Sequence, residues 1–250
     1  MNIIPIKTKF LQKEPIKNIL HQIKKEGIPI ENGDVLVFTS KIISQQEKRL
    51  VELNKIKPSK KAIDFSKKYK IDKKFCQLII NESDKIISGT TNAILTFKNN
   101  ILIANAGIDL SNAPKKHAYL WPKSPTNSAE KIKKTIKKEF NKSVGIIISD
   151  SHCSPARLGT TALAIAVAGF EPVKSEIGEL DLFDKPIKIT YHNLADELAC
   201  TANFLMGESN QKIPAVLIKK ANITLSGKSA KVLTNKLLIN KNKDLFNKLY

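Results

Sequence analysis

Acidic and hydroxyl side chains directly follow apolar runs at several points of this 250-residue chain, and they are its best candidates for chemistry. Asp109 follows the run ILIANAGI, and Asp150 with Ser151 follows VGIII. Glu208 stands between a helical pattern and a strand pattern. Ligands tend to bind at strand ends in mixed α/β sheets. These oxygens could therefore hold one or two divalent cations. For each acid taken alone, a helix cap or turn role is the alternative.

Two basic residues could bind an anion beside these acids. Lys41 ends the segment Thr39-Ser40-Lys41, which follows the apolar run VLVF. Arg157 is one of only two arginines in the chain and lies in the loop SPARLG. A planar guanidinium in such a loop suits a carboxylate or a phosphate. An exposed arginine with little energetic effect is the alternative.

Other catalytic patterns are weak or missing. His152-Cys153 resembles a nucleophile pair, but a triad needs neighbours in space and a third orienting group. We therefore favour a structural or substrate-lining role for both residues. The chain contains no GxxxxGK[ST] phosphate loop, no GxGxxG, no HExxH and no GxSxG. The common nucleotide-binding and hydrolase folds are accordingly disfavoured.

The elements that must position these residues can be read from hydrophobic spacing and turn residues. The mixture of helices and strands favours an α+β or α/β fold. The pattern predicts helices at 15–27, 57–88, 128–140 and 193–206. It predicts strands at 35–38, 93–97, 101–104, 144–148, 187–192 and 214–218. The remaining segments are a loop at 113–127, a small apolar segment at 160–170 and a partly helical tail at 228–250.

Composition bounds the class of protein. The apolar fraction of 42% supports a real core and argues against disorder. The net charge of +19 comes from lysines spread along nearly the whole chain, without interleaved aromatic residues. This pattern favours a solvated surface over nucleic-acid binding. Three cysteines without CxxC spacing favour a reducing compartment. With no signal-peptide pattern and no bilayer-length apolar run, we expect a cytoplasmic protein without membrane contact.

Taken together, these segments resemble the coenzyme F-420-0:γ-L-glutamate ligase family over almost the whole chain. The stretches NAGID-x-SN and LADE…N-x-LMGE…IPAV carry the resemblance most specifically. The matching segments are ENGDVLVFTSKIIS (31–44), NAGIDLSNA (105–113), SAEKIKKTI (128–136), VGIIISDS (144–151), GTTALAIAVAGF (159–170) and LADELACTANFLMGESNQKIPAVLI (194–218).

The resemblance implies a GTP- or ATP-dependent enzyme that adds L-glutamate to a carboxylate of an acceptor through an acyl phosphate, with Mg²⁺ or Mn²⁺ as two bound ions. It implies metal ligands at Asp109, Asp150, Ser151 and Glu208. Lys41 and Arg157 are candidates for phosphate or substrate-carboxylate contacts, with Asp109, Asp150 and Arg157 as the catalytic set. The implied nucleotide contacts are Phe10, Leu11, Gln12, Lys13, Ser40, Lys41, Asn112, Met206, Gly207, Ser209 and Ile213.

The resemblance also implies an α+β fold with mixed sheets and helices, assembled as an intertwined homodimer. We expect residues 1–250 to form one such unit, or two interleaved subdomains, without a fused C-terminal flavin domain. Three features depart from the archaeal pattern. Residues 7–13 (KTKFLQK) replace a Gly-x-Pro stretch, Gln45 replaces a frequent lysine, and the loop after Ser151 reads HCSPARL. Bacterial relatives with a similar S-P-x-R-x-G-T-T loop resemble folate γ-glutamate ligases, so the acceptor is either F-420-0 or a folate. A non-catalytic relative that binds nucleotide is the alternative function.

Overall fold

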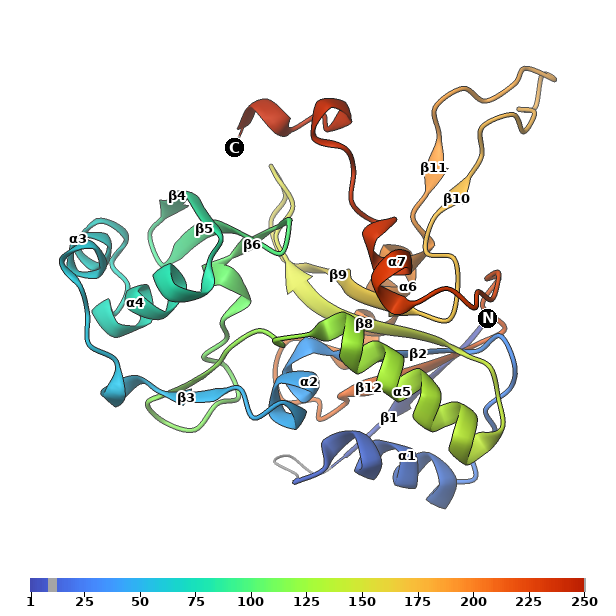
Figure 1. Cartoon of the computed structure of the whole chain (residues 1–250), viewed down its shortest axis with the longest axis horizontal. Helices are drawn as coiled ribbons and strands as arrows, with labels where there is room; N and C mark the ends of the chain where they lie inside the picture. Colours follow the sequence, from blue (N-terminus) through green and yellow to red (C-terminus); the bar gives the residue numbers. More distant parts are fainter. Residues whose placement is uncertain (9–12, 250) are drawn as a thin grey trace.

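The computed structural model describes residues 1–8 and 13–249, and its centre is a five-stranded mixed sheet (Figure 1). The strand order is β1 (Asn2–Ile6), β12 (Ala215–Lys219), β2 (Val35–Thr39), β8 (Gly145–His152) and β9 (Thr161–Ala168). Strands β2 and β8 run parallel, and the other neighbours are antiparallel. The parallel pair brings the carboxyl ends of two central strands to the same side of the sheet.

Helices cover both faces of this sheet. Helices α1 (Pro15–Lys25), α2 (Ser40–Gln46) and α5 (Pro125–Phe140) contribute to the core on one face. Helix α6 (Leu194–Met206) covers the other face, and α7 (Ala230–Asn235) contacts β9 and α5. Along β2 the side chains of residues 36 and 38 enter the first core and those of 35 and 37 the second. A strand covered on both faces is continuously apolar, as VLVF is.

A smaller unit, to the left in Figure 1, has its own core. It contains α3 (Lys60–Tyr69), α4 (Lys73–Glu82) and the antiparallel sheet of β4 (Lys85–Thr90), β5 (Ala93–Lys98) and β6 (Ile101–Ala104). The pair β3 (Leu50–Glu52) and β7 (His117–Tyr119) lies between this unit and the main sheet. The described residues also form four short 3-10 turns: η1 (Leu53–Lys55), η2 (Asn105–Gly107), η3 (Lys241–Lys243) and η4 (Asn247–Leu249). The predicted α+β class with mixed sheets is confirmed.

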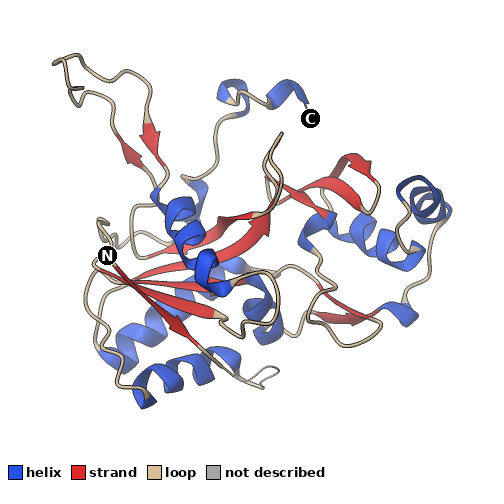
Figure 2. Cartoon of the chain, turned by 180° about the vertical axis from the view of Figure 1, so that it is seen from behind, coloured by secondary structure: helices blue, strands red, loops and turns tan. Residues whose placement is uncertain are grey.

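An extended arm leaves the body between β10 (Lys174–Ser175) and β11 (Tyr191–His192) (Figures 1 and 2). Backbone hydrogen bonds hold it together, among them Gly178 N–H to Ile187 O at 3.0 Å. Several large apolar side chains on it face solvent, including Leu182 (98% exposed), Phe183 (79%) and Ile189 (84%). Exposed apolar surface of this kind commonly marks an interaction site.

Strand β9 forms one edge of the main sheet, and side chains pair with its outer backbone groups. The Ala164 N–H donates to Asp196 Oδ1 at 2.7 Å, and the Val167 N–H donates to Thr234 Oγ1 at 2.9 Å. The Thr234 hydroxyl in turn donates to the Val167 carbonyl at 3.3 Å. Buried edge groups need such partners because an unpaired buried amide is costly.

Several predicted elements have different bounds in the structure. The helical stretch 57–88 is two helices followed by β4, because the chain turns at Lys70, whose φ is +55°. The predicted strand 187–192 is confined to Tyr191–His192, with the rest in the arm. Helix α5 begins at Pro125 rather than Ser128, since proline suits the first helical turn. Strand β1 was missed altogether.

Among the described residues, no helix is long and apolar enough to cross a bilayer.

A buried ion pair beneath the main sheet offers a test of the fold. The Asp34 side chain is 2% exposed and lies 3.4 Å from Lys219 Nζ, whose side chain is 10% exposed. Asp34 also accepts from the Glu31 N–H at 2.8 Å. Lys219 Nζ also lies 3.3 Å from the more exposed Glu31 carboxylate. Replacing Asp34→Asn removes the buried partner of Lys219 and leaves only Glu31, so we expect the free energy of unfolding to fall by up to about 3 kcal/mol. Urea unfolding of both proteins measures this.

The matched control is the double variant Asp34→Asn/Lys219→Met, which removes both charges and keeps the apolar stem of residue 219. It should recover most of the lost stability, because an uncompensated buried charge then no longer exists. Equal destabilisation in the single and the double variant would show that the ion pair is not the cause.

Candidate active site

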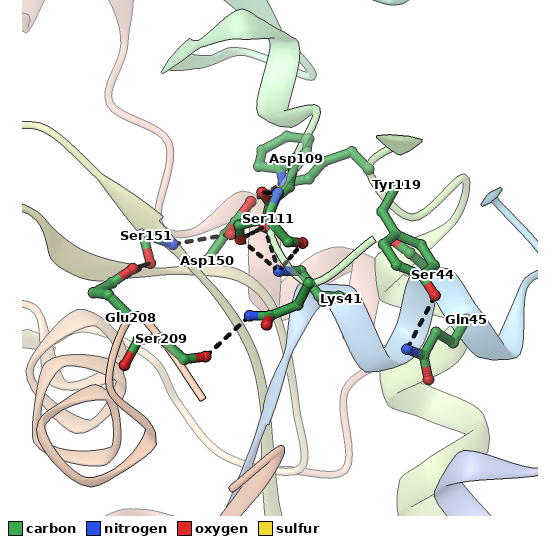
Figure 3. A network of polar contacts seen from close by, with 12 residues as sticks. Lys41, Ser44, Gln45, Asp109, Ser111, Tyr119, Asp150, Ser151, Glu208 and Ser209 are labelled. Atoms are coloured by element: carbon green, nitrogen blue, oxygen red, sulfur yellow. Dashed lines mark hydrogen bonds and ion pairs between the residues drawn. The ribbon is translucent and has the colours of Figure 1, made fainter. Parts of the chain in front are cut away.

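A cavity of about 460 Å³ opens at the carboxyl ends of β2 and β8. Three segments distant in sequence supply most of its wall: 39–45, 149–151 and 203–214. The loop that follows η2 adds Asp109, Ser111 and Asn112. Figure 3 shows polar side chains from these segments pointing toward one another. The cavity size falls within the range of small-molecule sites.

Asp150 and Ser151 lie inside β8, not after it as the sequence suggested. The strand continues to His152, because β9 pairs with it opposite Leu163 and Ala162. The Asp150 carboxylate accepts from the Ser151 N–H at 2.9 Å and from the Trp121 indole N–H. The extended strand therefore fixes two oxygen-bearing side chains at the cavity floor.

The carboxyl of Asp150 is strongly perturbed. Burial raises the pKa of Asp150 to about 6, because the ionised form loses hydration. Hydrogen bonds from Trp121, the Ser151 amide and Ser40 hold this pKa down, and the neighbouring Asp109 charge raises it. A cavity residue with a pKa moved this far is a functional candidate.

Asp109 is held by a short polar network. Its Oδ2 lies 2.5 Å from Lys41 Nζ and accepts from the Ser111 hydroxyl at 3.0 Å. The Ser111 N–H donates to the other carboxylate oxygen at 2.6 Å. Lys41 also donates to the Ser111 carbonyl at 3.0 Å (Figure 3). Lys41 thus supplies positive charge beside this carboxylate.

Glu208 faces Ser151 across the cavity. The Ser151 hydroxyl lies 2.9 and 3.0 Å from the two Glu208 oxygens, and Asn203 Nδ2 donates to Oε1 at 3.0 Å. Glu208 follows Gly207, whose φ is +64° and where a Cβ would come within 2.4 Å of the Gln211 side chain. Only glycine therefore fits the turn that carries Glu208 out of α6.

The structure brings all four predicted metal ligands into this one cavity. Their donors are all oxygens, which is the set that Mg²⁺ and Mn²⁺ prefer. Across residues 1–8 and 13–249, however, no three acidic, histidine or cysteine side chains already form a metal-binding group. Cation binding would need the Ser151–Glu208 hydrogen bond to open and Lys41 to leave Asp109. The donor set fits a divalent cation, and the ligand geometry is not preformed.

The predicted nucleotide contacts divide into two groups. One group lines the cavity: Ser40, Lys41, Asn112, Met206, Gly207, Ser209 and Ile213. Within it, Asn112 Nδ2 donates to the Ser209 carbonyl at 3.0 Å and ties two of the loops together. Lys13 is exposed and is not among the lining residues. Phe10, Leu11 and Gln12 lie outside the described residues.

Gln45, named above as a departure from the archaeal pattern, also lines the cavity. Its Nε2 donates to the Tyr119 hydroxyl at 3.3 Å, as Figure 3 shows. Its Oε1 is buried without a hydrogen-bond partner. Gln45 therefore leaves an unused hydrogen-bond acceptor in the cavity wall.

Arg157, His152 and Cys153 are not brought into the cavity. Arg157 is exposed in the β8–β9 loop. The His152 ring contacts the hydroxyls of Thr161 at 3.3 Å and Ser154 at 3.5 Å, and burial lowers its pKa. Cys153 is exposed, and within the described chain no hydrogen bond joins its thiol to His152. A catalytic role for Arg157 stays a prediction, and the structure supports no nucleophile pair.

Sequence reasoning missed two residues that matter here. Trp121 contacts Asp150 directly, and Asn203 contacts Glu208. Asn203 lies within the stretch LADE…N-x-LMGE, so its motif carried a signal that was not used. Trp121 lies in a segment assigned as loop, and its one signal was that it is the only tryptophan of the chain.

Comparisons with known proteins show which family this chain resembles in sequence. A family model described as F420-0:Gamma-glutamyl ligase matches residues 7–220. The chain is 43% identical over 196 residues to the coenzyme F420:L-glutamate ligase of Methanocaldococcus jannaschii, covering 78% of each chain. It is 39% identical to the enzyme of the same name from Methanococcus maripaludis strain S2, covering 87% of this chain and 86% of the relative. It is 33% identical to the coenzyme F420:L-glutamate ligase of Archaeoglobus fulgidus, covering 83% of this chain and 84% of the relative.

The raised pKa of Asp150 gives a stability prediction for the metal-free protein. The carboxyl has an ordinary pKa of 3.8 and a folded pKa of about 6, so the native state holds an extra proton between these values. Stability due to this group is therefore lost as pH rises from about 4 to 6. The variant Asp150→Asn should gain stability relative to the unchanged protein over this range, and the difference should level off near pH 7.

Thermal unfolding in EDTA at pH 4, 5, 6 and 7 measures the two melting temperatures. Other titrating groups are common to both proteins, so their contributions cancel in the difference. If the two melting temperatures differ by the same amount at every pH, the raised pKa of Asp150 is contradicted.

Proposed function

The chain belongs to the F420-0:gamma-glutamyl ligase family, and on this premise we propose that it joins L-glutamate to a carboxylate of coenzyme F420 or of its precursor F420-0. The proposed bond is an amide formed by the glutamate amine. The main support for this proposal is one cavity, which is lined by Asp109, Asp150, Ser151 and Glu208 together with Lys41. Relatives named coenzyme F420:L-glutamate ligase support the same reaction class.

The proposed reaction begins by activating the acceptor, because an amine does not displace oxide from a free carboxylate. The acceptor carboxylate attacks the terminal phosphorus of a nucleoside triphosphate, and the bond to the diphosphate breaks. The glutamate amine then attacks the carbonyl carbon of the acyl phosphate. The carbon–oxygen bond to phosphate breaks, and the amine loses its proton. Catalysis of this kind needs positioning and charge neutralisation more than a protein nucleophile.

In this proposal Asp109, Asp150, Ser151 and Glu208 hold one or two Mg²⁺ or Mn²⁺ ions. Such cations neutralise charge that develops on phosphoryl oxygens. Lys41 would exchange its contact with Asp109 for a phosphate oxygen, since its ammonium is a flexible point charge. The support is that all five side chains share one cavity wall.

The proposed nucleotide is GTP or ATP, bound along Ser40, Lys41, Asn112 and the loop 206–213. These residues line the cavity beside the carboxylates. Contacts from residues 10–13 and from Arg157 are retained as predictions. Arg157 could reach a substrate only if the exposed β8–β9 loop approaches the cavity.

A folate is the second proposed acceptor. The loop S-P-A-R-L-G-T-T at 154–161 favours it. The names of the matched relatives favour the deazaflavin coenzyme instead.

We also propose that the enzyme is a homodimer built through the β10–β11 arm. Leu182, Phe183 and Ile189 are almost fully exposed on a hairpin that projects from the body (Figure 2). Burying such side chains is favourable by about 1.5–3 kcal/mol each, which a second copy could supply. An arm with so few contacts to its own chain is otherwise hard to stabilise.

A direct assay tests the reaction. The purified protein is incubated with Mg²⁺ or Mn²⁺, GTP or ATP, glutamate, and either F420-0 or tetrahydrofolate. We expect phosphate release together with an acceptor whose mass has grown by one glutamyl residue. The variant Glu208→Gln should weaken Mn²⁺ binding by more than about tenfold, because even outer partners of metal ligands are worth about 10–100-fold.

The control is Glu26→Gln, which neutralises an exposed carboxylate at the end of α1 that is not among the residues lining the cavity. It should keep full activity. Tight nucleotide binding without product from either acceptor would favour a non-catalytic relative and overturn the ligase proposal.

The oligomer is tested by changing the arm alone. The double variant Leu182→Ser/Phe183→Ser removes two exposed apolar side chains and should shift the molar mass in light scattering from dimer to monomer. The variant Lys185→Ser/Lys188→Ser changes two exposed lysines of the same arm and should remain dimeric. A monomeric unchanged protein, or a dimer that survives the first variant, would contradict this assembly.

A further inference from the structure

Trp121 is the only tryptophan of the chain and is 1% exposed. Its indole N–H donates to Asp150 Oδ2. The proposed reaction assigns it no role, since it is neither a cation ligand nor a nucleotide contact. An apolar side chain would suffice to fill the core at this position. The hydrogen bond to a carboxylate at the cavity floor therefore needs its own explanation.

The indole ring is packed against a residue that must be glycine. A Cβ built on Gly107 would come within 2.6 Å of both Trp121 Cδ1 and Nε1. Gly107 also has a φ of +68°, which other residues rarely adopt. The backbone that leads to Asp109 thus passes directly against the ring that binds Asp150. One aromatic ring contacts both acid-bearing segments.

The backbone of Trp121 is held as firmly as its ring. Arg49 Nε donates to the Trp121 carbonyl at 3.1 Å, and Arg49 Nη2 lies 2.8 Å from Glu82 Oε2. Lys98 Nζ lies 2.6 Å from the same Glu82 oxygen and donates to the Glu82 carbonyl at 2.8 Å. Glu82 ends α4 and Lys98 ends β5, so this network belongs to the smaller unit.

The segment before Trp121 is fixed as well. The Leu120 N–H donates to the Arg49 carbonyl at 3.1 Å, and the Ser44 hydroxyl donates to the Leu120 carbonyl at 2.7 Å. The Leu120 amide, the Leu120 carbonyl and the Trp121 carbonyl therefore each have a hydrogen-bond partner. Little freedom remains for the indole to turn away from Asp150.

Two of the hydrogen bonds that Asp150 accepts reach different oxygens and so orient its carboxylate. The Ser151 N–H takes Oδ1 and the Trp121 indole takes Oδ2. Each carboxylate oxygen can accept more than one partner, so both remain able to bind a cation. Outer partners of this kind orient metal ligands and are worth about 10–100-fold in metal affinity.

We propose that Trp121 is a positioning residue that fixes the Asp150 carboxylate for cation binding, and that the Arg49–Glu82–Lys98 network fixes Trp121. This rests on the proposed role of Asp150 as a cation ligand. The smaller unit then acts on the site through Arg49 and Trp121, in addition to supplying Asp109.

The experiment measures Mn²⁺ binding by electron paramagnetic resonance, without nucleotide or turnover. Trp121→Phe keeps the aromatic ring and removes the N–H, and it should weaken Mn²⁺ binding by about 10–100-fold. Glu82→Gln should weaken it by a smaller factor, although Glu82 is not among the residues that line the cavity. Ile136→Val, a buried change in α5, is the control for lost packing and should bind Mn²⁺ normally.

A second readout works without metal. The single tryptophan gives one indole N–H resonance in a ¹⁵N correlation spectrum. In the unchanged protein this proton should exchange slowly with solvent, and its resonance should move in Asp150→Asn and stay in Ile136→Val. Mn²⁺ should also quench the tryptophan fluorescence, and the Mn²⁺ concentration at half-quenching should match the one found by electron paramagnetic resonance.

Unchanged Mn²⁺ affinity in Trp121→Phe would overturn the positioning role while leaving the proposed ligase reaction intact. Absence of Mn²⁺ binding in the unchanged protein would overturn the cation site, and the proposal with it. An indole resonance that ignores Asp150→Asn would overturn the contact itself.

Discussion

The parallel pairing of β2 with β8 is the constraint on which the site depends. Its register sets Thr39 opposite Ser149, so Ser40 and Lys41 leave the sheet beside Asp150 and Ser151. On the other side of β2, the Thr39 N–H donates to the Pro214 carbonyl at 3.0 Å, which anchors the loop that follows Glu208. Three segments that are distant in the sequence therefore meet at one end of the parallel strand pair. A slip of one residue would turn every side chain of β8 to the other face.

Local desolvation outweighs the overall charge within the cavity. A chain with a net charge of +19 should favour ionised carboxylates, yet burial raises the pKa of Asp150 to about 6. Most lysines are exposed and screened by solvent and salt, so their effect at this carboxyl is small. Lys41 is the exception, because it reaches Asp109 at 2.5 Å. Burial therefore outweighs the lysine-rich surface in setting the pKa of Asp150.

Sequence patterns predicted local elements well and their contacts poorly. The strands predicted at 93–97 and 101–104 and the helix predicted at 193–206 follow from spacing and turn residues, and all three are confirmed. Family resemblance placed Asp109, Asp150, Ser151 and Glu208, which the fold brings into one cavity. Spacing could not show that β8 runs on through Asp150, since that depends on pairing with β9. The two arginines illustrate the limit: Arg157 attracted notice by its loop, whereas Arg49 makes the buried contacts.

Both edges of the main sheet carry residues that hinder the addition of a further strand. On β9, the Asp196 carboxylate and the Thr234 hydroxyl already occupy outer backbone groups. On β1, Pro5 has no N–H to offer. A free sheet edge is a template on which other chains can polymerise, and natural proteins blunt such edges. Because of Asp196, Thr234 and Pro5, a crowded solution of this protein should resist cross-β aggregation through its largest sheet, even though VLVF and VGIII are strongly β-forming sequences.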